Sequence, residues 1–308
     1  MNFYAHILGS GAAIPTLRRN CSSQYVFCNN RHILLDCGEG TQLQLRRNKI
    51  HFQRISHILI SHLHGDHFFG LPGLISTLNL MGRTEGIRIY GPEPLKEIIF
   101  NILSAGGNPL LFDIPFTPLK GNTLECIYED DIISIQAFPL KHRIPTWGFR
   151  INEKPKPYGI DIEKCTSLNV GRQHFERLKQ GKDIDIEGRK LAFQHLTKPP
   201  KKSFSYAYCS DTKYDESIVE FIQDVDVLYH EATFLNLHKQ RAKETFHSTA
   251  EQAARIAFRA RVGQLVLGHF SSRYKDTSKF IEEGQKEFTN IVLGEDNLKF
   301  SIEAPIKP

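Results

Sequence analysis

The feature that most constrains the fold of this chain is a cluster of metal-ligand side chains in the segment Ser61-His-Leu-His-Gly-Asp-His67. An apolar run, Ile58-Leu59-Ile60, predicts a buried strand that leads into the cluster. A tight turn at Gly65 then allows four polar side chains to converge, namely His62, His64, Asp66 and His67. Imidazole and carboxylate groups are zinc ligands, and packing alone rarely produces this spacing. The segment therefore predicts a metal site at the end of a strand.

Further ligand-type residues follow downstream, which we expect because four ligands in one loop cannot all reach one tetrahedral ion. His142 follows the alternating residues Ile133, Ile135 and Ala137. Asp211 follows the apolar stretch that ends at Cys209, and His269 follows Leu265-Val266-Leu267 and one glycine. Each lies just past the carboxyl end of an expected strand, where open α/β sheets place their sites. Taken alone, each is equally explained as an ordinary strand-end residue, but together they complete two coordination shells.

Short β-branched runs alternate with helical patterns along the chain, so we expect the α/β class. The expected strands are 4–8, 25–27, 33–36, 57–61, 87–90, 132–138, 204–209, 225–229 and 264–267. The expected helices are 41–48, 68–80, 94–105, 216–223, 249–260 and 277–289. Chain length and this alternation are consistent with a single domain over residues 1–308.

One segment, residues 152–202, differs from the rest in composition. It is rich in lysine, proline and glycine and has little periodic apolar pattern, so we expect a flexible arm inserted into the domain, without a core of its own. Between Ile151 and Lys202 there are twelve Lys/Arg and seven Asp/Glu, a surplus of five that equals the net charge of the whole chain, +5. Such an excess suits a polyanionic partner. A solvated surface loop explains the charge equally well.

The composition also indicates the cellular compartment in which we expect the protein. No apolar run approaches the roughly 18 residues that a membrane helix needs, and no secretory signal is visible at the start of the chain. The six cysteines are scattered, without a CxxC pair, which indicates reduced thiols in the cytoplasm and not a disulfide framework. We therefore expect a cytoplasmic protein with no membrane partner.

These motifs together resemble the metallo-β-lactamase superfamily and, within it, ribonuclease Z, the endonuclease family that trims the 3′ ends of transfer RNA precursors. The cluster from Ser61 to His67 identifies only the superfamily. The segments that point to ribonuclease Z are His230-Glu-Ala-Thr233, His247-Ser-Thr249 and Gly268 to Tyr274. The matching segments are Leu8 to Pro15 with Arg19-Asn20, Leu35 to Thr41, Ser61 to His67, Ser210-Asp-Thr212, His230-Glu-Ala-Thr233, His247-Ser-Thr249 and Gly268 to Tyr274.

The resemblance implies an αββα sandwich and two zinc ions per chain. One ion would be bound by His62, His64, His142 and Asp211, and the other by Asp66, His67, His269 and the bridging Asp211. Two such ions suit phosphodiester cleavage, because they lower the pKa of a shared water and stabilise the attacking and leaving oxygens. The expected function is cleavage of precursor tRNA near its 3′ end, and the expected assembly is a homodimer.

Three residues are the expected catalytic groups: Asp66 as general base, His247 as the acid for the leaving 3′ oxygen, and Glu231 as a residue that orients His247. His247 precedes Ser248-Thr-Ala-Glu251, a pattern typical of a capping box at a helix start, where an anion can bind. A histidine packed against the helix is the structural alternative. His230 is either an orienting residue or a buried strand-end residue. Asp36 either bonds a ligand histidine or caps a turn.

Arg19 and Arg273 lie inside matched motifs and are the expected RNA contacts. The arm departs from the exosite arm of the bacterial members, because it lacks their glycine-proline core, and Leu17 stands where the family often has lysine. Two other functions stay open at this point. One is a small-molecule hydrolase of the arylsulfatase or phosphodiesterase type, against which the basic arm and the His230 loop argue. The other is a non-catalytic RNA-binding relative, against which the intact ligand set argues.

Overall fold

The computed structural model describes residues 2–107 and 109–303, which form two compact units. The larger unit comprises residues up to 152 and from 204 onward, and the smaller unit is Glu153–Ser203. Among the described helices, none combines the length and the apolar character that crossing a membrane requires.

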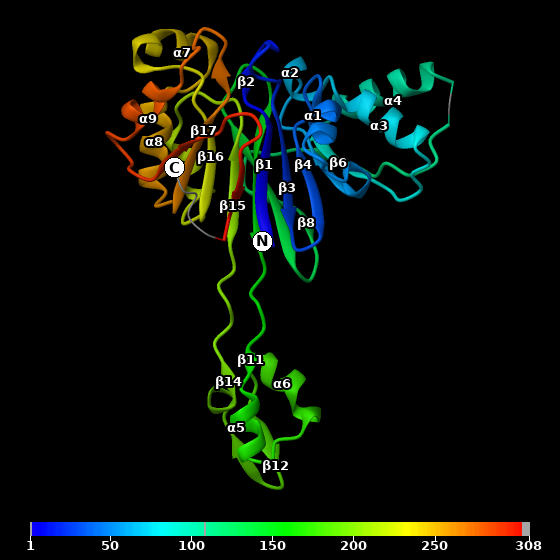
Figure 1. Cartoon of the computed structure of the whole chain (residues 1–308), viewed down its shortest axis with the longest axis vertical. Coiled ribbons are helices and arrows are strands. Elements are labelled where there is room, and N and C mark those ends of the chain that lie inside the picture. The colour runs from blue at the N-terminus through cyan, green and yellow to red at the C-terminus, as the bar shows by residue number, and fades with distance from the viewer. Residues whose placement is uncertain (1, 108, 304–308) are drawn as a thin grey trace. The chain divides into compact units, whose positions relative to one another are not determined.

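The larger unit is built on two mixed seven-stranded sheets (Figure 1). The first sheet has, in spatial order, β20 (Lys299–Ser301), β1 (Phe3–Gly9), β3 (Ser23–Cys28), β4 (Arg31–Leu35), β5 (His57–Leu59), β6 (Arg88–Pro92) and β7 (Phe116–Leu119). The second has β19 (Ile291–Leu293), β17 (Gln264–Gly268), β16 (Val227–Glu231), β15 (Ser205–Cys209), β10 (Thr146–Glu153), β9 (Ile133–Leu140) and β8 (Glu125–Glu129). Two short strands, β2 (Gly11–Ala12) and β18 (Phe270–Ser271), pair separately in parallel.

The core lies between these sheets because their strands alternate in side-chain direction. Phe3, Ala5 and Ile7 of β1 share one buried cluster with Ile133 and Ile135 of β9. Helices cover the outer faces (Figure 1): α1 (Thr41–Arg47), α3 (Leu71–Leu80) and α4 (Pro94–Ala105) on the first sheet, and α8 (Ala250–Arg259) and α9 (Ser278–Gly284) on the second. The expected α/β class and αββα sandwich are confirmed.

The expected strands are all present. Several further strands were not expected, because the apolar pattern of their sequences is weaker. In β10, Trp147, Phe149 and Ile151 alternate toward the core, a period-two signal that the basic residues downstream obscure. β7, β8 and β20 are short or half-exposed strands with few apolar residues, and β19 is apolar but only three residues long. Such strands form because a neighbouring strand offers hydrogen bonds, which no local pattern reveals.

Three expected helices differ from those observed. The stretch 68–80 divides into α2 (Gly65–Phe68) and α3, since Pro72 favours a fresh first turn. Residues 216–220 form a 3₁₀ helix. α9 ends at Gly284, and α7 (Lys239–Thr245) was not expected. The capping box of α8 is also displaced by one residue: Thr249 and Gln252 form it, and not Ser248 and Glu251.

The smaller unit is more ordered than a plain loop. It contains β11 (Gly159–Ile160), α5 (Ile162–Ser167), α6 (Phe175–Lys179), β12 (Ile184–Ile186), β13 (Arg189–Leu191) and β14 (Thr197–Lys198). The expectation that this segment has no core of its own is wrong. Six buried residues from elements scattered through the unit pack together, namely Cys165, Val170, Leu178, Ile184, Leu191 and Leu196. Their irregular spacing explains why periodicity did not predict them.

Candidate metal centre

The seven expected ligands come together at one edge of the two sheets. His62 and His64 follow β5, and His67 lies in α2, just beyond. Asp211 and His269 follow β15 and β17, which run parallel through β16, so their carboxyl ends meet at the same edge. His142 follows β9. Because these strand ends meet at one edge, residues that are far apart in the sequence become neighbours there.

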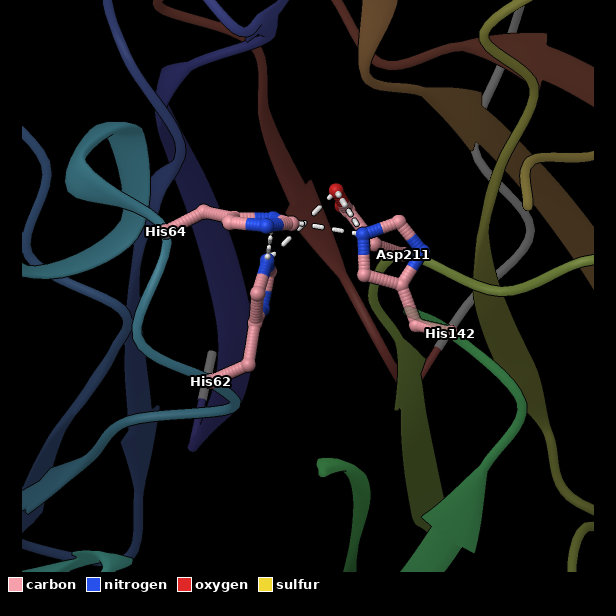
Figure 2. A group of neighbouring side chains, drawn as sticks. All are labelled: His62, His64, His142 and Asp211. Atoms are coloured by element: carbon pink, nitrogen blue, oxygen red, sulfur yellow. Dashed lines mark hydrogen bonds and ion pairs between the residues drawn. The ribbon is translucent and has the colours of Figure 1, made fainter. Parts of the chain in front are cut away.

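The first group comprises His62, His64, His142 and Asp211, whose side chains point toward one another (Figure 2). Nε2 of His62 lies 3.0 Å and Nε2 of His142 lies 3.2 Å from Nδ1 of His64. Asp211 Oδ2 completes the group at 3.6 Å from His62 Nε2 and 3.7 Å from His142 Nε2. Three imidazoles and one carboxylate oxygen thus surround one point, a donor set that suits a tetrahedral divalent ion.

The second group comprises Asp66, His67 and His269. Asp66 Oδ2 lies 3.4 Å from His67 Nε2 and 3.6 Å from His269 Nε2. Asp211 reaches this group with its other oxygen, since Oδ1 lies 3.3 Å from His67 Nε2 and 3.2 Å from His269 Nε2. One carboxylate therefore faces both groups, each through a different oxygen.

The second group fits a cation on two counts. Within the described residues, only four buried side-chain nitrogens have no hydrogen-bond partner, and two of them are His67 Nε2 and His269 Nε2 in this group. Such orphaned polar atoms are costly unless a ligand satisfies them. Burial disfavours the charged form of His67, but the carboxylates of Asp211, Asp66 and Asp36 outweigh it and raise the His67 pKa well above its usual value. The centre thus has an excess of negative charge that a divalent cation would balance.

Hydrogen bonds from behind fix the ligand rings. Asp36, which is fully buried, accepts from His67 Nδ1 at 2.8 Å, from the Tyr208 hydroxyl at 2.7 Å and from the Ser61 amide at 2.7 Å. The carbonyl of Phe246 lies 2.9 Å from His142 Nδ1. Each of these bonds leaves Nε2 to face the centre, as metal-binding histidines require. Of the two interpretations of Asp36, the structure shows the contact with a ligand histidine.

A second carboxylate, Glu231, forms hydrogen bonds on the side of the centre where His247 and His269 lie. Its Oε2 accepts from the Thr233 hydroxyl at 2.8 Å, and that hydroxyl oxygen lies 2.9 Å from His269 Nδ1. Its Oε1 accepts from His247 Nδ1 at 2.8 Å. Burial disfavours the imidazolium of His247, but the charge of Glu231 and this hydrogen bond prevail and raise the His247 pKa to about 9. Glu231 therefore holds a proton on a histidine beside the ligands.

The hydrogen bond of His230 is made to the backbone and not to a ligand. Its side chain is buried, and its Nδ1 lies 2.7 Å from the carbonyl of Glu231, the next residue in β16. Of the two interpretations, that of a buried strand-end residue fits the structure.

The two expected RNA contacts have opposite environments. Arg19 is buried, donates twice to Glu295 and once to the Tyr274 carbonyl, and lies over Phe270. Its guanidinium thus makes its hydrogen bonds within the fold. Arg273 is exposed, its guanidinium lies 4.9 Å from the Phe234 ring centroid, and its Nε donates to the Ser271 hydroxyl at 3.1 Å.

The ligands open into a cleft of about 320 Å³. Besides the ligands, the cleft is lined by residues that include Ala13, Arg143 and His247. The Ala13 amide donates to Asp66 Oδ2 at 2.8 Å, which connects the segment after β2 to the ligand segment after β5. Arg143, Thr233 and Ala13 were not among the expected site residues. Thr233 and Ala13 lie in the matched segments, and Arg143 directly follows a ligand, so adjacency was the available signal.

Comparisons with known proteins agree with this geometry. Ribonuclease Z of Parabacteroides distasonis is 43% identical over 302 residues, which are 98% of this chain and 99% of that protein. Ribonuclease Z of Porphyromonas gingivalis is 40% identical over 301 residues, 97% of this chain and 99% of that protein. The crystal structure of human tRNase Z, short form, superposes with a TM-score of 0.72 at 29% identity and covers 97% of this chain and 99% of that chain.

A family model described as "Anti-Pycsar protein Apyc1" also matches, over residues 3–115, which is the part of the chain that holds the first ligand cluster. The full-length relatives decide between the families, because they extend over both sheets and all seven ligand positions. The chain therefore belongs to the ribonuclease Z family, a group of metal-dependent endoribonucleases with the metallo-β-lactamase fold.

Proposed function

We propose that this protein is a zinc-dependent endoribonuclease that cleaves precursor tRNA near its 3′ end and holds two zinc ions per chain. The observation that carries this proposal is Asp211, whose two oxygens face two separate groups of ligands. All ligands are imidazoles and carboxylates, the donors that zinc accepts where no thiolate is present. When bound, the ions would supply Lewis acidity, lowering the pKa of a water and neutralising charge on the phosphate.

Asp66 is proposed as ligand and general base at once. Its Oδ2 faces His67 and His269 and accepts from the Ala13 amide. Among the described residues, none donates a hydrogen bond to its Oδ1, so that oxygen is available to take a proton from the attacking water. Burial would raise the pKa of Asp66, but the charge of His67 reverses this and lowers it, so the carboxylate is ionised at neutral pH.

His247 is proposed as the acid that protonates the leaving 3′ oxygen. It lines the cleft, only 14% of its side chain is exposed, and Glu231 favours its protonated form. A donor that is charged at neutral pH suits departure of an alkoxide, and such acids contribute roughly 10²- to 10⁴-fold in rate. Thr233 links Glu231 to His269 and so ties the position of the acid to that of a ligand.

RNA contacts are proposed at two places in the chain. The first comprises two exposed cations that can contact phosphates: Arg143, which lines the cleft, and Arg273, which follows the ligand His269 in the sequence. The second place is the smaller unit, which carries the chain's surplus of five positive charges and is proposed as the exosite arm that binds tRNA. Its own buried core supports this role, because a folded unit can present its lysines and arginines in fixed positions.

We also propose a cytoplasmic homodimer. All six cysteines are free, which suits a reducing compartment. On α3 and α4 and beside them, several large apolar side chains are exposed, a pattern that marks an association surface: Leu80, Met81, Phe100, Ile102 and Leu111. Sedimentation should show a dimer, and Ile102→Lys should give a monomer if this surface is the interface.

The function is tested by incubating zinc-loaded protein with a precursor tRNA that has a defined 3′ trailer. We expect one cut, leaving a 3′-hydroxyl on the tRNA and a 5′-phosphate on the trailer, because water attacks phosphorus and the 3′ oxygen leaves. The Asp66→Ala variant should give no product, since it lacks both a ligand and the base. Cleavage of a small phosphodiester with none of the precursor would favour the small-molecule hydrolase instead.

A further inference from the structure

A second cavity, of about 570 Å³, shares His247 with the metal cleft. We call it the lysine pocket, after three of its lining residues, Lys213, Lys239 and Lys243. The others are His247, Tyr214, Phe246, Gln240 and Gln252. Its volume is within the range of cavities that take small ligands. None of the seven metal ligands lines it, so metal binding does not explain it.

The pocket is positively charged. Lys239 and Lys243 lie one turn apart in α7 and are exposed, while the Lys213 ammonium is 5.3 Å from the Phe246 ring centroid. No carboxylate in the described parts of the chain pairs with these three lysines, whereas Lys120, Lys141, Lys156, Lys164 and Lys179 all have an acidic partner. Unpaired cations around a concave surface attract an anionic ligand.

Phe246 adds an aromatic surface at a conformational cost. It follows α7 with φ +58°, in the left-handed region where glycine is the usual residue at a helix end. Its carbonyl orients His142, but a glycine would supply the same carbonyl without strain. The ring, which faces the pocket, is what phenylalanine adds at this position.

An aromatic ring beside several ammonium groups is the chemistry that recognises a nucleotide, because the base stacks on the ring and the phosphate pairs with the cations. The position of His247 indicates which nucleotide of the RNA would lie in the pocket. As the proposed acid, it contacts the leaving 3′ oxygen, and it forms part of the wall of both cavities. The sugar that carries this oxygen would therefore lie beside His247, with the lysine pocket next to it.

We infer that the lysine pocket binds the nucleotide on the 5′ side of the scissile phosphate, with its base on Phe246 and its own 5′ phosphate on Lys239 and Lys243. This inference rests on the proposed function. It makes Phe246 a specificity and positioning residue for the last nucleotide of the mature RNA.

The first test measures coupling between Phe246 and that base. Zinc-loaded wild type and Phe246→Leu would each cleave three precursors: intact, abasic at the last nucleotide before the cut, and abasic at the first trailer nucleotide. In the wild type, loss of the 5′-side base should raise KM roughly tenfold or more, the usual effect of losing one stacked base. Phe246→Leu should raise KM for the intact precursor by a similar factor and add little for the 5′-abasic precursor.

The outcomes separate the inference from the proposed function. Cleavage of the intact precursor by the wild type supports the function, and coupling confined to the 5′-side base supports the pocket. Equal losses on all three precursors would overturn the pocket assignment, and so would coupling to the trailer base. A wild type that bound zinc but left the intact precursor uncut would overturn the proposed function and, with it, this inference.

The second test concerns the lysines and does not depend on Phe246. In the Lys239→Ala/Lys243→Ala double variant, the slope of log K for precursor binding against log salt should fall by about 1.4, at about 0.7 for each lost single-strand phosphate contact. The matched control is Lys96→Ala/Lys120→Ala, which removes two exposed lysines elsewhere; Lys96 lies on α4, well apart from α7 in Figure 1. The control should keep the wild-type slope. An unchanged slope in the pocket variant would overturn the inference.

Discussion

At the scale of single residues, His247 and Glu231 are the pair on which the proposed chemistry depends. Their 2.8 Å contact lies beside the ligands. His247 also lies within reach of Asp211 and His269, but Glu231 favours its protonated form, which cannot bind a metal through either ring nitrogen. Geometry therefore allows chemistry and metal binding to be separated. His247→Ala should slow the chemical step by roughly 10²- to 10⁴-fold while zinc content stays that of the wild type. Single-turnover cleavage and metal analysis on the same preparation test this; loss of zinc in the variant would make His247 a structural residue.

The same pair predicts a pH effect. A general acid works in its protonated form, so activity is present below its pKa and falls as pH rises through it. Glu231 raises the His247 pKa to about 9, so the wild type should stay active into the alkaline range. In Glu231→Gln, the charge is gone and the alkaline limb of the log kcat profile should move down toward about 6.5, the ordinary histidine value. The control is Glu220→Gln, at an exposed position, which should keep the wild-type profile. A limb that did not move in Glu231→Gln would exclude His247 as the acid.

At the scale of helices and strands, the sequence predicted the positions of the ligands better than the details around them. Buried runs such as Ile58-Leu59-Ile60 and Leu265-Val266-Leu267 are strong strand signals, and a ligand follows each. Contacts behind the ligands, such as Tyr208 with Asp36, join residues that are 172 positions apart, so no local pattern reveals them. The core of the smaller unit was missed for a related reason, because its residues are brought together only by the fold.

The displaced capping box of α8 gives a prediction at this scale. The Thr249 hydroxyl accepts from the Gln252 amide, and the Gln252 side chain accepts from the Thr249 amide. Loss of an N-cap costs typically about 1 kcal/mol, so Thr249→Ala should lower the free energy of unfolding by about that amount. Urea titration with saturating zinc measures it. Thr84→Ala, at an exposed position outside the helices, should unfold as the wild type does. Equal stability of both variants would contradict the observed cap.

At the scale of the whole molecule, the smaller unit can be removed without touching a ligand. The Ser203 hydroxyl donates to the Lys154 carbonyl at 2.8 Å, so the two segments that connect the unit lie side by side there. Deleting residues 155–201 and joining the ends with a short linker removes ten Lys/Arg and six Asp/Glu. The deletion should therefore weaken binding of precursor tRNA and flatten its salt dependence. Hydrolysis of a small phosphodiester should continue at the wild-type rate. Unchanged RNA affinity and salt slope would show that the unit is not an exosite.

The proposed chemistry depends on one carboxylate, Asp211, which faces both groups of ligands. Metal analysis of wild type, His64→Ala, His269→Ala and Asp211→Asn at equal free zinc tests it most directly. We predict about two zinc ions per chain in the wild type, loss of about one in each histidine variant, because each belongs to one group, and loss from both sites in Asp211→Asn. A wild type that bound a single ion at saturating zinc, or an Asp211→Asn variant that lost only one of two, would contradict the account.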